Sequence, residues 1–156
     1  MDITIIKPLE KHLEQMVKLT DESRQYHNEI LNGYFKEDAS AAELDVIKQH
    51  MLEDKDHIIF IATDKDDNVL GMIYGGISYK PWLEKSKIGR VSVLVVSKQA
   101  RRNGIGKKLM DAFVTECKNR GMQEVRLGVY NKNKSAYDFY VNYGFESLKQ
   151  DMNIIL

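Results

Sequence analysis

The chain has 156 residues, and its 23 lysine and arginine residues balance its 23 aspartate and glutamate residues. This length suits one domain over residues 1–156, with a core of useful size, and the composition is ordinary for a globular protein. No apolar run approaches the ~20 residues of a membrane span, and no signal-peptide pattern opens the chain, so the expected location is cytoplasmic.

Apolar periodicity predicts one short strand, two helices and a hairpin in the first half of the chain. In chain order these are a strand at 3–6, a helix from 9 to about 19, a helix at 41–52, and strands at 58–63 and 69–78. Residues 26–36 are aromatic and polar without clean periodicity, which is typical of a loop or a broken helix. Such a segment often lines a substrate cleft.

The second half alternates strands with helices. The predicted elements are a strand ending at Val96, a helix at 105–118 with Gly121 as its C-cap, a strand at 125–129, a helix from Asn133 to Gly144, and a last strand at 153–156. The resulting order is β-α-α-β-β-β-α-β-α-β. The expected fold class is α/β, an α+β mixed sheet with helices on both faces.

The most informative segment is the basic glycine turn, defined as Arg101-Arg102-Asn103-Gly104-Ile105-Gly106. A strand precedes it and a helix follows it. The first amides of a helix lack helical partners and favour anions, so this arrangement predicts a phosphate site. It does not fit a P-loop, because Lys108 stands where that motif has serine or threonine. It does not fit a dinucleotide-binding loop either, because Leu109 stands where that motif has its last glycine.

A second motif lies about 30 residues further on. It reads Asn133-Lys134-Ser135-Ala136-Tyr137-Asp138-Phe139-Tyr140, followed by Tyr143-Gly144-Phe145. Ala136 and Tyr140 are four residues apart and therefore share one face of a helix. Together the two motifs resemble the R-x-x-G-x-G turn and the N-x-x-A-x-x-x-Y-x-x-x-G-F block of the GNAT superfamily of N-acetyltransferases. The resemblance covers nearly the whole chain and is weakest over residues 1–57.

The resemblance implies that acetyl-CoA is the co-substrate. The basic glycine turn and Lys107 would hold the pyrophosphate of coenzyme A, and Asn133 and Ala136 would lie along its pantetheine arm. The backbone of Leu94, Val95 and Val96 would pair with that arm, where two parallel strands separate, and would polarise the thioester carbonyl. Tyr140 matches the tyrosine that protonates the departing thiolate. No metal is expected, because His12, His27, His50 and His57 lack metal-ligand spacing.

The general base is left open by the resemblance. Ser92 stands where many family members carry a glutamate, and serine cannot accept a proton at neutral pH. Either a chain of waters passes Ser92 or another residue serves, with His27, Glu29 and Glu84 as candidates. The only cysteine, Cys117, is predicted to be a core residue, with a nucleophile as the minor alternative.

The acceptor is expected to be a primary amine with a positive charge. Residues 1–67 contain 16 acidic and 8 basic residues, whereas residues 68–156 contain 7 and 15. Carboxylates and aromatic faces suit a cation, so the predicted acceptor-binding residues are Tyr26, His27, Glu29 and Tyr34, with Ser92 nearby. A small molecule and a protein amine both remain open. Alternatively, Tyr34 and Phe35 only pack the turn between two helices and do not bind the acceptor.

Other functions remain as alternatives. The first is a catalytically silent module that binds or senses acyl-CoA, because Ser92 replaces the usual base. The second is a nucleic-acid-binding domain, which the zero net charge and the lack of paired strand aromatics disfavour. The expected partners are therefore acetyl-CoA and an amine acceptor, with a homodimer as an option and with no nucleic acid or membrane.

Overall fold

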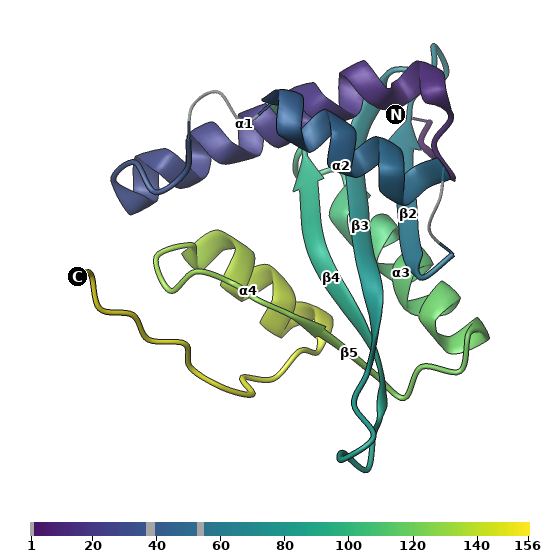
Figure 1. Cartoon of the computed structure of the whole chain (residues 1–156). Helices are drawn as coiled ribbons and strands as arrows, with labels where there is room; N and C mark the ends of the chain where they lie inside the picture. The colour runs from purple at the N-terminus through teal and green to yellow at the C-terminus, as the bar shows by residue number, and fades with distance from the viewer. Residues whose placement is uncertain (1, 37–39, 53–54) are drawn as a thin grey trace.

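The computed structural model describes residues 2–36, 40–52 and 55–156. Its centre is a five-stranded sheet in the order β1-β2-β3-β4-β5 (Figure 1). The strands are β1 (Thr4–Ile6), β2 (His57–Thr63), β3 (Val69–Tyr79), β4 (Lys87–Val96) and β5 (Glu124–Leu127). The first four strands pair antiparallel, and β5 pairs parallel to β4. The mixed sheet predicted from the sequence is therefore confirmed.

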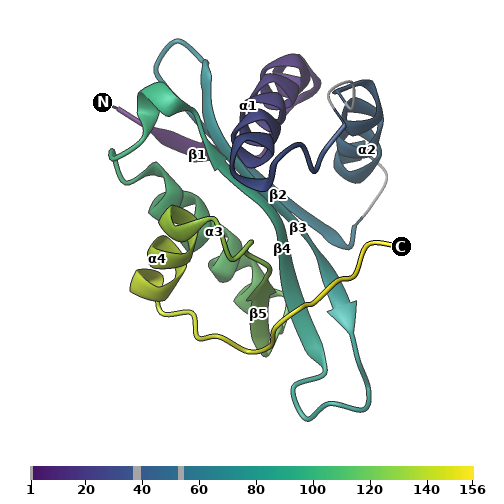
Figure 2. The same ribbon diagram turned by 90° about the vertical axis from the view of Figure 1, so that its left-hand side faces the viewer.

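Helices cover both faces of this sheet, as predicted. They are α1 (Leu13–Leu31), α2 (Ser40–Leu52), α3 (Ile105–Asn119) and α4 (Lys134–Tyr143). Figure 2 shows α1 and α2 on one side and α3 and α4 on the other. No helix in the described ranges is long and apolar enough to cross a membrane.

Each face of the sheet has its own apolar core. Along β2, Ile58 and Ala62 belong to the cluster that includes α3, whereas Ile59 and Ile61 belong to the cluster that includes α1. Successive side chains of a strand point to opposite faces, so a strand buried on both sides is apolar throughout. Cys117 is buried in the α3 cluster, which confirms its prediction as a core residue.

A β-bulge interrupts β4 beside its separation from β5. Tyr74 lies opposite Val93 and Gly75 opposite Val91, so Ser92 is the extra residue. A Cβ on Gly75 would lie 2.0 Å from the Arg90 carbonyl oxygen, so this position requires glycine. Pairing between β4 and β5 also ends at Val91, and the end of β4 is left with β3 as its one strand neighbour in the described sheet.

Helix α1 is longer than its apolar pattern predicts. It includes residues 26–31 of the segment that the sequence leaves as a loop or a broken helix. It ends at Asn32, which is left-handed with φ 56°, and the Asn28 side chain then bonds both backbone groups of Phe35. The helical pattern is hidden because this end of α1 faces a cavity with polar side chains rather than the core.

The last predicted strand, at residues 153–156, is not formed, so this prediction is wrong. The chain after α4 runs without regular structure, and Ile154 and Ile155 are 83% and 90% exposed. In Figure 1 it leaves the end of α4 and runs outward to the C-terminus. A strand-like sequence forms a strand only where an edge is within its reach.

Candidate active site

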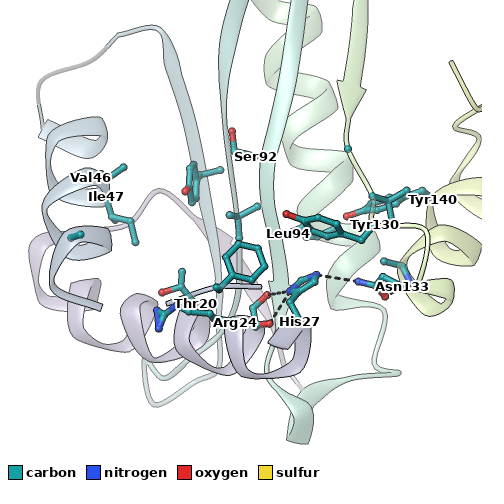
Figure 3. A pocket seen from close by; sticks show the side chains of 18 residues that line it. Thr20, Arg24, His27, Val46, Ile47, Ser92, Leu94, Tyr130, Asn133 and Tyr140 are labelled. Carbon is teal, nitrogen blue, oxygen red and sulfur yellow. Dashed lines mark hydrogen bonds between the residues drawn. The ribbon is translucent and has the colours of Figure 1, made fainter. Parts of the chain in front are cut away.

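A cavity of about 450 Å³ lies where β4 separates from β5. Side chains from α1, α2, β3, β4, the β5–α4 connection and α4 line it (Figure 3). Of the residues predicted for the site, it brings together His27, Ser92, Leu94, Asn133, Ala136 and Tyr140. Residues predicted for the cofactor and for the acceptor therefore line one continuous space of the size typical of small-molecule sites.

The basic glycine turn forms the start of α3. Gly104 is the N-cap, with φ 73°, and it makes no side-chain cap hydrogen bond. The first helical hydrogen bond runs from the Lys108 amide to the Gly104 carbonyl, so the amides of residues 105–107 precede the helical ladder. Such amides and the positive end of the helix dipole bind anions. The turn therefore offers backbone amides to an anion.

Basic side chains surround the basic glycine turn, and the first helical turn of α3 contains no acidic residue. Arg101, Arg102 and Lys108 are exposed, and Lys107 is held by Asp111 at 2.8 Å. Arg101 also donates to the Val96 carbonyl from Nε and lies over the Tyr26 ring. The positive charges therefore lie beside the amides of α3. Because they are exposed, salt should weaken their attraction for a phosphate.

Asn133 connects α4 to α1. Its Oδ1 accepts from the Ala136 amide at 3.2 Å and caps α4. Its Nδ2 therefore faces the other way and lies 3.3 Å from Nε2 of His27. The Tyr26 hydroxyl also donates to Oδ1, at 3.5 Å. Asn133 is 7% exposed, so this arrangement is fixed by burial as well as by hydrogen bonds.

The same contacts determine the tautomer of His27. Its Nδ1 lies 2.8 Å from the Ser23 carbonyl oxygen, which can only accept, so Nδ1 carries the hydrogen. Nε2 is then the acceptor and takes its hydrogen bond from Asn133. Figure 3 shows the two side chains directed toward one another across the cavity. His27 thus presents a basic lone pair on the side where α1 and α4 meet.

Tyr140 lies on α4 one turn after Ala136, and both residues line the cavity. Its ring packs edge-on against Phe139 and Phe145, with centroid separations of 5.4 Å and 5.9 Å. Burial raises the pKa of Tyr140 to about 12. The phenol therefore keeps its proton throughout the neutral range and remains a hydrogen-bond donor.

Aromatic rings gather beside His27 at the end of α1. The aromatic cluster consists of Tyr26, His27, Tyr34, Phe35 and Tyr130, with centroid separations of 5.2–6.1 Å. His27, Phe35 and Tyr130 line the cavity. Tyr26 contacts Arg101 and Asn133 instead, and Tyr34 is 65% exposed and packs on Phe35 and Tyr130. The cluster therefore borders the cavity at this end of α1.

Two of the three candidate bases lie away from the cavity. Glu29 is exposed on α1, and Glu84 is exposed in the connection between β3 and β4. Neither lines the cavity, whereas His27 does. Ser92 lines it from the bulge of β4. Among these candidates, only His27 places a proton acceptor at the site.

The sequence reasoning missed Thr20, Arg24 and Tyr130. On α1, Leu13, Met16, Thr20, Arg24 and His27 recur at helical spacing, so the apolar stripe continues as a polar one. This change from apolar to polar residues along one face of α1 is the sequence feature that could have located Thr20 and Arg24 at the site. Arg24 is 7% exposed and bonded to Asp21 at 2.5 Å, so its charge is matched within the protein.

Two other kinds of site receive no support. Burial raises the pKa of the Cys117 thiol to about 11, so it is a poor nucleophile at neutral pH. Within residues 2–36, 40–52 and 55–156, no group of three or more potential metal ligands comes together. The polar groups that line the cavity include Tyr140, His27 and Asn133.

Comparisons with known proteins identify the family of this chain. The acetyltransferase (GNAT) family model matches residues 23–145. The chain is also similar to N-alpha-acetyltransferase 30 of Schizosaccharomyces pombe, with 27% identity over 132 residues that span 83% of this chain and 84% of that protein.

Solved structures share the fold. A mutant of the BH1408 protein from Bacillus halodurans has a TM-score of 0.86 at 19% identity, with 100% of this chain and 99% of that chain covered. AAC(6')-Iy in complex with the bisubstrate analogue CoA-S-monomethyl-acetylneamine has a TM-score of 0.74 at 20% identity, with the same coverage. The chain belongs to the acetyltransferase (GNAT) family and is an acetyl-CoA-dependent acyltransferase.

Proposed function

We propose that residues 1–156 act as one N-acetyltransferase domain, which transfers the acetyl group of acetyl-CoA to a primary amine by direct attack in a ternary complex. The observation that carries this proposal is the single cavity shared by Tyr140 and Asn133 on one side and His27 on the other. The burial of Cys117 also supports direct attack rather than an acyl-cysteine intermediate.

The coenzyme fits the residues at the two predicted positions. The amides of residues 105–107 and the exposed basic side chains would hold the pyrophosphate. Residues 94–96 of β4 extend past the last pair with β5, so their backbone groups would meet the pantetheine arm and the thioester carbonyl. Donors aimed at a developing oxyanion contribute about 10²–10³ each in rate.

Tyr140 would act on the leaving group. A free thiol has a pKa near ~8.5, so its thiolate leaves readily when one donor stabilises it. The raised pKa of Tyr140 keeps the phenol protonated, and this also makes complete proton transfer to sulfur unfavourable. Tyr140 therefore stabilises the departing sulfur by donating a hydrogen bond. The released thiolate takes up a proton from water, and His27 returns the proton of the amine to water.

His27 would accept the proton that the amine loses. Its Nε2 is the basic nitrogen, because Nδ1 donates to Ser23. In the described structure this lone pair takes a hydrogen bond from Asn133, a weak competitor that an incoming ammonium group can replace. Ser92 then needs no role as a base. Its contribution would be the bulge in β4, which shapes the wall of the cavity.

The acceptor would be a cationic amine that meets the aromatic cluster. Tyrosine and phenylalanine faces attract cations, and the charge of Arg24 is matched by Asp21. The exposed position of Glu29 argues against direct recruitment by that carboxylate. The similarity to an N-alpha-acetyltransferase adds peptide N-terminal amines to the classes worth testing.

Release of free thiol from acetyl-CoA should report this activity directly. A panel of diamines, peptides with free N-termini, lysine derivatives and glutamate should give turnover with cationic amines well above that with glutamate. Coenzyme A binding without turnover on any primary amine would contradict the proposal. Higher turnover with glutamate than with diamines and peptides would contradict the cationic acceptor alone.

His27→Asn should lower kcat by about 10²–10³, within the range that a general base contributes. Asparagine keeps a donor near the Ser23 carbonyl but lacks a basic nitrogen. The measurement is kcat with a cationic amine at saturating acetyl-CoA.

Ser23→Ala is the matched control, because it removes a hydroxyl 3.4 Å from Nδ1 and keeps the carbonyl partner. An unchanged kcat in His27→Asn, with chemistry rate-limiting, would rule His27 out as the base.

A further inference from the structure

One wall of the cavity is apolar and lies on the side of α2. This α2 wall is defined here as Phe35, Ala42, Val46 and Ile47, which all line the cavity. Val46 is 43% exposed and Ile47 is 2% exposed, so the wall runs from the surface of the molecule into its core. In Figure 3, Val46 and Ile47 lie at the opposite end of the cavity from Tyr140. An apolar ligand group that enters here would leave water and cover exposed apolar surface.

Phe35 is held in the α2 wall by the side chain of Asn28. The Asn28 Nδ2 donates to the Phe35 carbonyl oxygen at 3.0 Å, and the Phe35 amide donates to Asn28 Oδ1 at 2.7 Å. Phe35 itself belongs to neither a helix nor a strand, whereas Asn28 lies on α1. One side chain therefore fixes both backbone groups of Phe35, and Asn28 sets the place from which the ring projects.

The Phe35 ring lies beside the imidazole of His27. The two rings meet edge-on with their centroids 6.0 Å apart, and Tyr130 packs edge-on against Phe35 at 6.1 Å. An amine that donates a hydrogen bond to Nε2 of His27 has its nitrogen about 3 Å from that atom. The carbons attached to this nitrogen then lie near Phe35, and a group on those carbons can extend along the α2 wall. The wall would therefore contact the part of the acceptor next to its reacting nitrogen.

We propose, on the basis of the function proposed above, that the acceptor is a primary amine with an apolar group one or two carbons from its nitrogen. Phe35 would be the residue that determines this specificity, and Asn28 would be the residue that positions Phe35. The apolar group would pack on Phe35 and Val46 and displace water from both side chains. A free arylalkylamine and the first residue of a peptide both offer this chemistry, so both enter the test.

Two matched pairs of acceptors test this preference on the unsubstituted chain. The first pair is 2-phenylethylamine and 1,4-diaminobutane, and the second is two peptides that differ only in leucine or asparagine as the first residue. In at least one pair, the apolar member should have a kcat/KM about 10-fold or more above the polar member, because one methylene in an apolar pocket already gives about 10-fold. A preference in the first pair alone identifies a free amine, and a preference in the second pair alone identifies a peptide.

Equal values within both pairs, or higher values for the polar members, would overturn the apolar acceptor and leave the proposed function standing. Absence of turnover with every primary amine would contradict the proposed function and the apolar acceptor together. The two failures are therefore distinguishable.

Substitutions at the two residues test their roles. Phe35→Ala should raise KM for the apolar member of the preferred pair by about 10-fold and change KM for the polar member much less. Phe35→Leu should restore most of the preference, because leucine keeps an apolar side chain at this position. Asn28→Ala removes both hydrogen bonds to Phe35 and should reduce the preference in the same direction as Phe35→Ala.

Asn119→Ala is the matched control, because it makes the same change as Asn28→Ala at an exposed residue at the end of α3. It should leave the preference unchanged, and circular dichroism matched to the unsubstituted chain establishes that each variant is folded. An unchanged preference in Phe35→Ala would overturn the role of Phe35. An equal loss of kcat for both members of the pair in Asn28→Ala, with the preference kept, would show that Asn28 only stabilises the turn and would overturn its role.

Discussion

Tyr140→Phe should lower kcat by about 10²–10³ and leave the affinity for acetyl-CoA nearly unchanged. The substitution removes one hydroxyl, whereas the ring keeps its packing against Phe139 and Phe145. The lost hydrogen bond matters most when charge develops on the departing sulfur. Steady-state kinetics with thiol detection, combined with calorimetric binding of acetyl-CoA, measures both effects.

Tyr143→Phe is the control for this experiment. Tyr143 lies on the same helix, and its hydroxyl donates to Asp111 at 2.8 Å rather than lining the cavity. Its loss should reduce stability by about 1 kcal/mol, the usual net value of a hydrogen bond, and leave kcat nearly unchanged. Equal losses of kcat in the two variants, or an unchanged kcat in Tyr140→Phe with chemistry rate-limiting, would remove Tyr140 from the mechanism.

Gly104→Asp should weaken acetyl-CoA binding by about 10²–10³-fold relative to Gly104→Asn, because like charges in contact cost several kcal/mol. Comparing these two variants separates the effect of the charge on binding from the effect of backbone strain. Both side chains tolerate the left-handed conformation that φ 73° imposes, and the space around a Cβ there is open. They have nearly the same shape and differ by one negative charge.

Calorimetric titration with acetyl-CoA at two salt concentrations measures this difference. Salt screens exposed charges, so affinity for the unsubstituted chain should fall as salt rises, and the gap between the two variants should narrow. Matched unfolding midpoints for the Asn and Asp variants serve as the control for folding. Equal affinities of the two variants would show that the basic glycine turn does not bind the pyrophosphate.

Much of the fold was readable because its signals are local. The apolar stripes of α3 and the alternation in β5 set the type and place of those elements, and the two motifs located the ends of α3 and α4. The bulge at Ser92 shifts the register of β4 against β3 by one residue, beside the point where β4 and β5 stop pairing. Register comes from pairing between distant segments, so no local pattern revealed the bulge.

The acceptor side of the site was harder to predict. Glu29 and His27 are two residues apart, and only the geometry of α1 decides that His27 faces the cavity while Glu29 is exposed. Without a helix assignment for residues 26–31, composition alone could not separate them. The contact between His27 and Asn133 spans 106 residues of sequence, and no spacing rule relates the two.

This contact has a thermodynamic consequence for the two substrates. Among the described residues, Asn133 Nδ2 donates to His27, so a coenzyme arm that takes up this amide as proposed would also release the His27 lone pair. An amine that occupies the lone pair would likewise release the amide. Each substrate would then raise the affinity for the other, and linkage requires the same factor in both directions. We therefore expect the two dissociation constants to be coupled, and a variant that breaks the contact should make them independent.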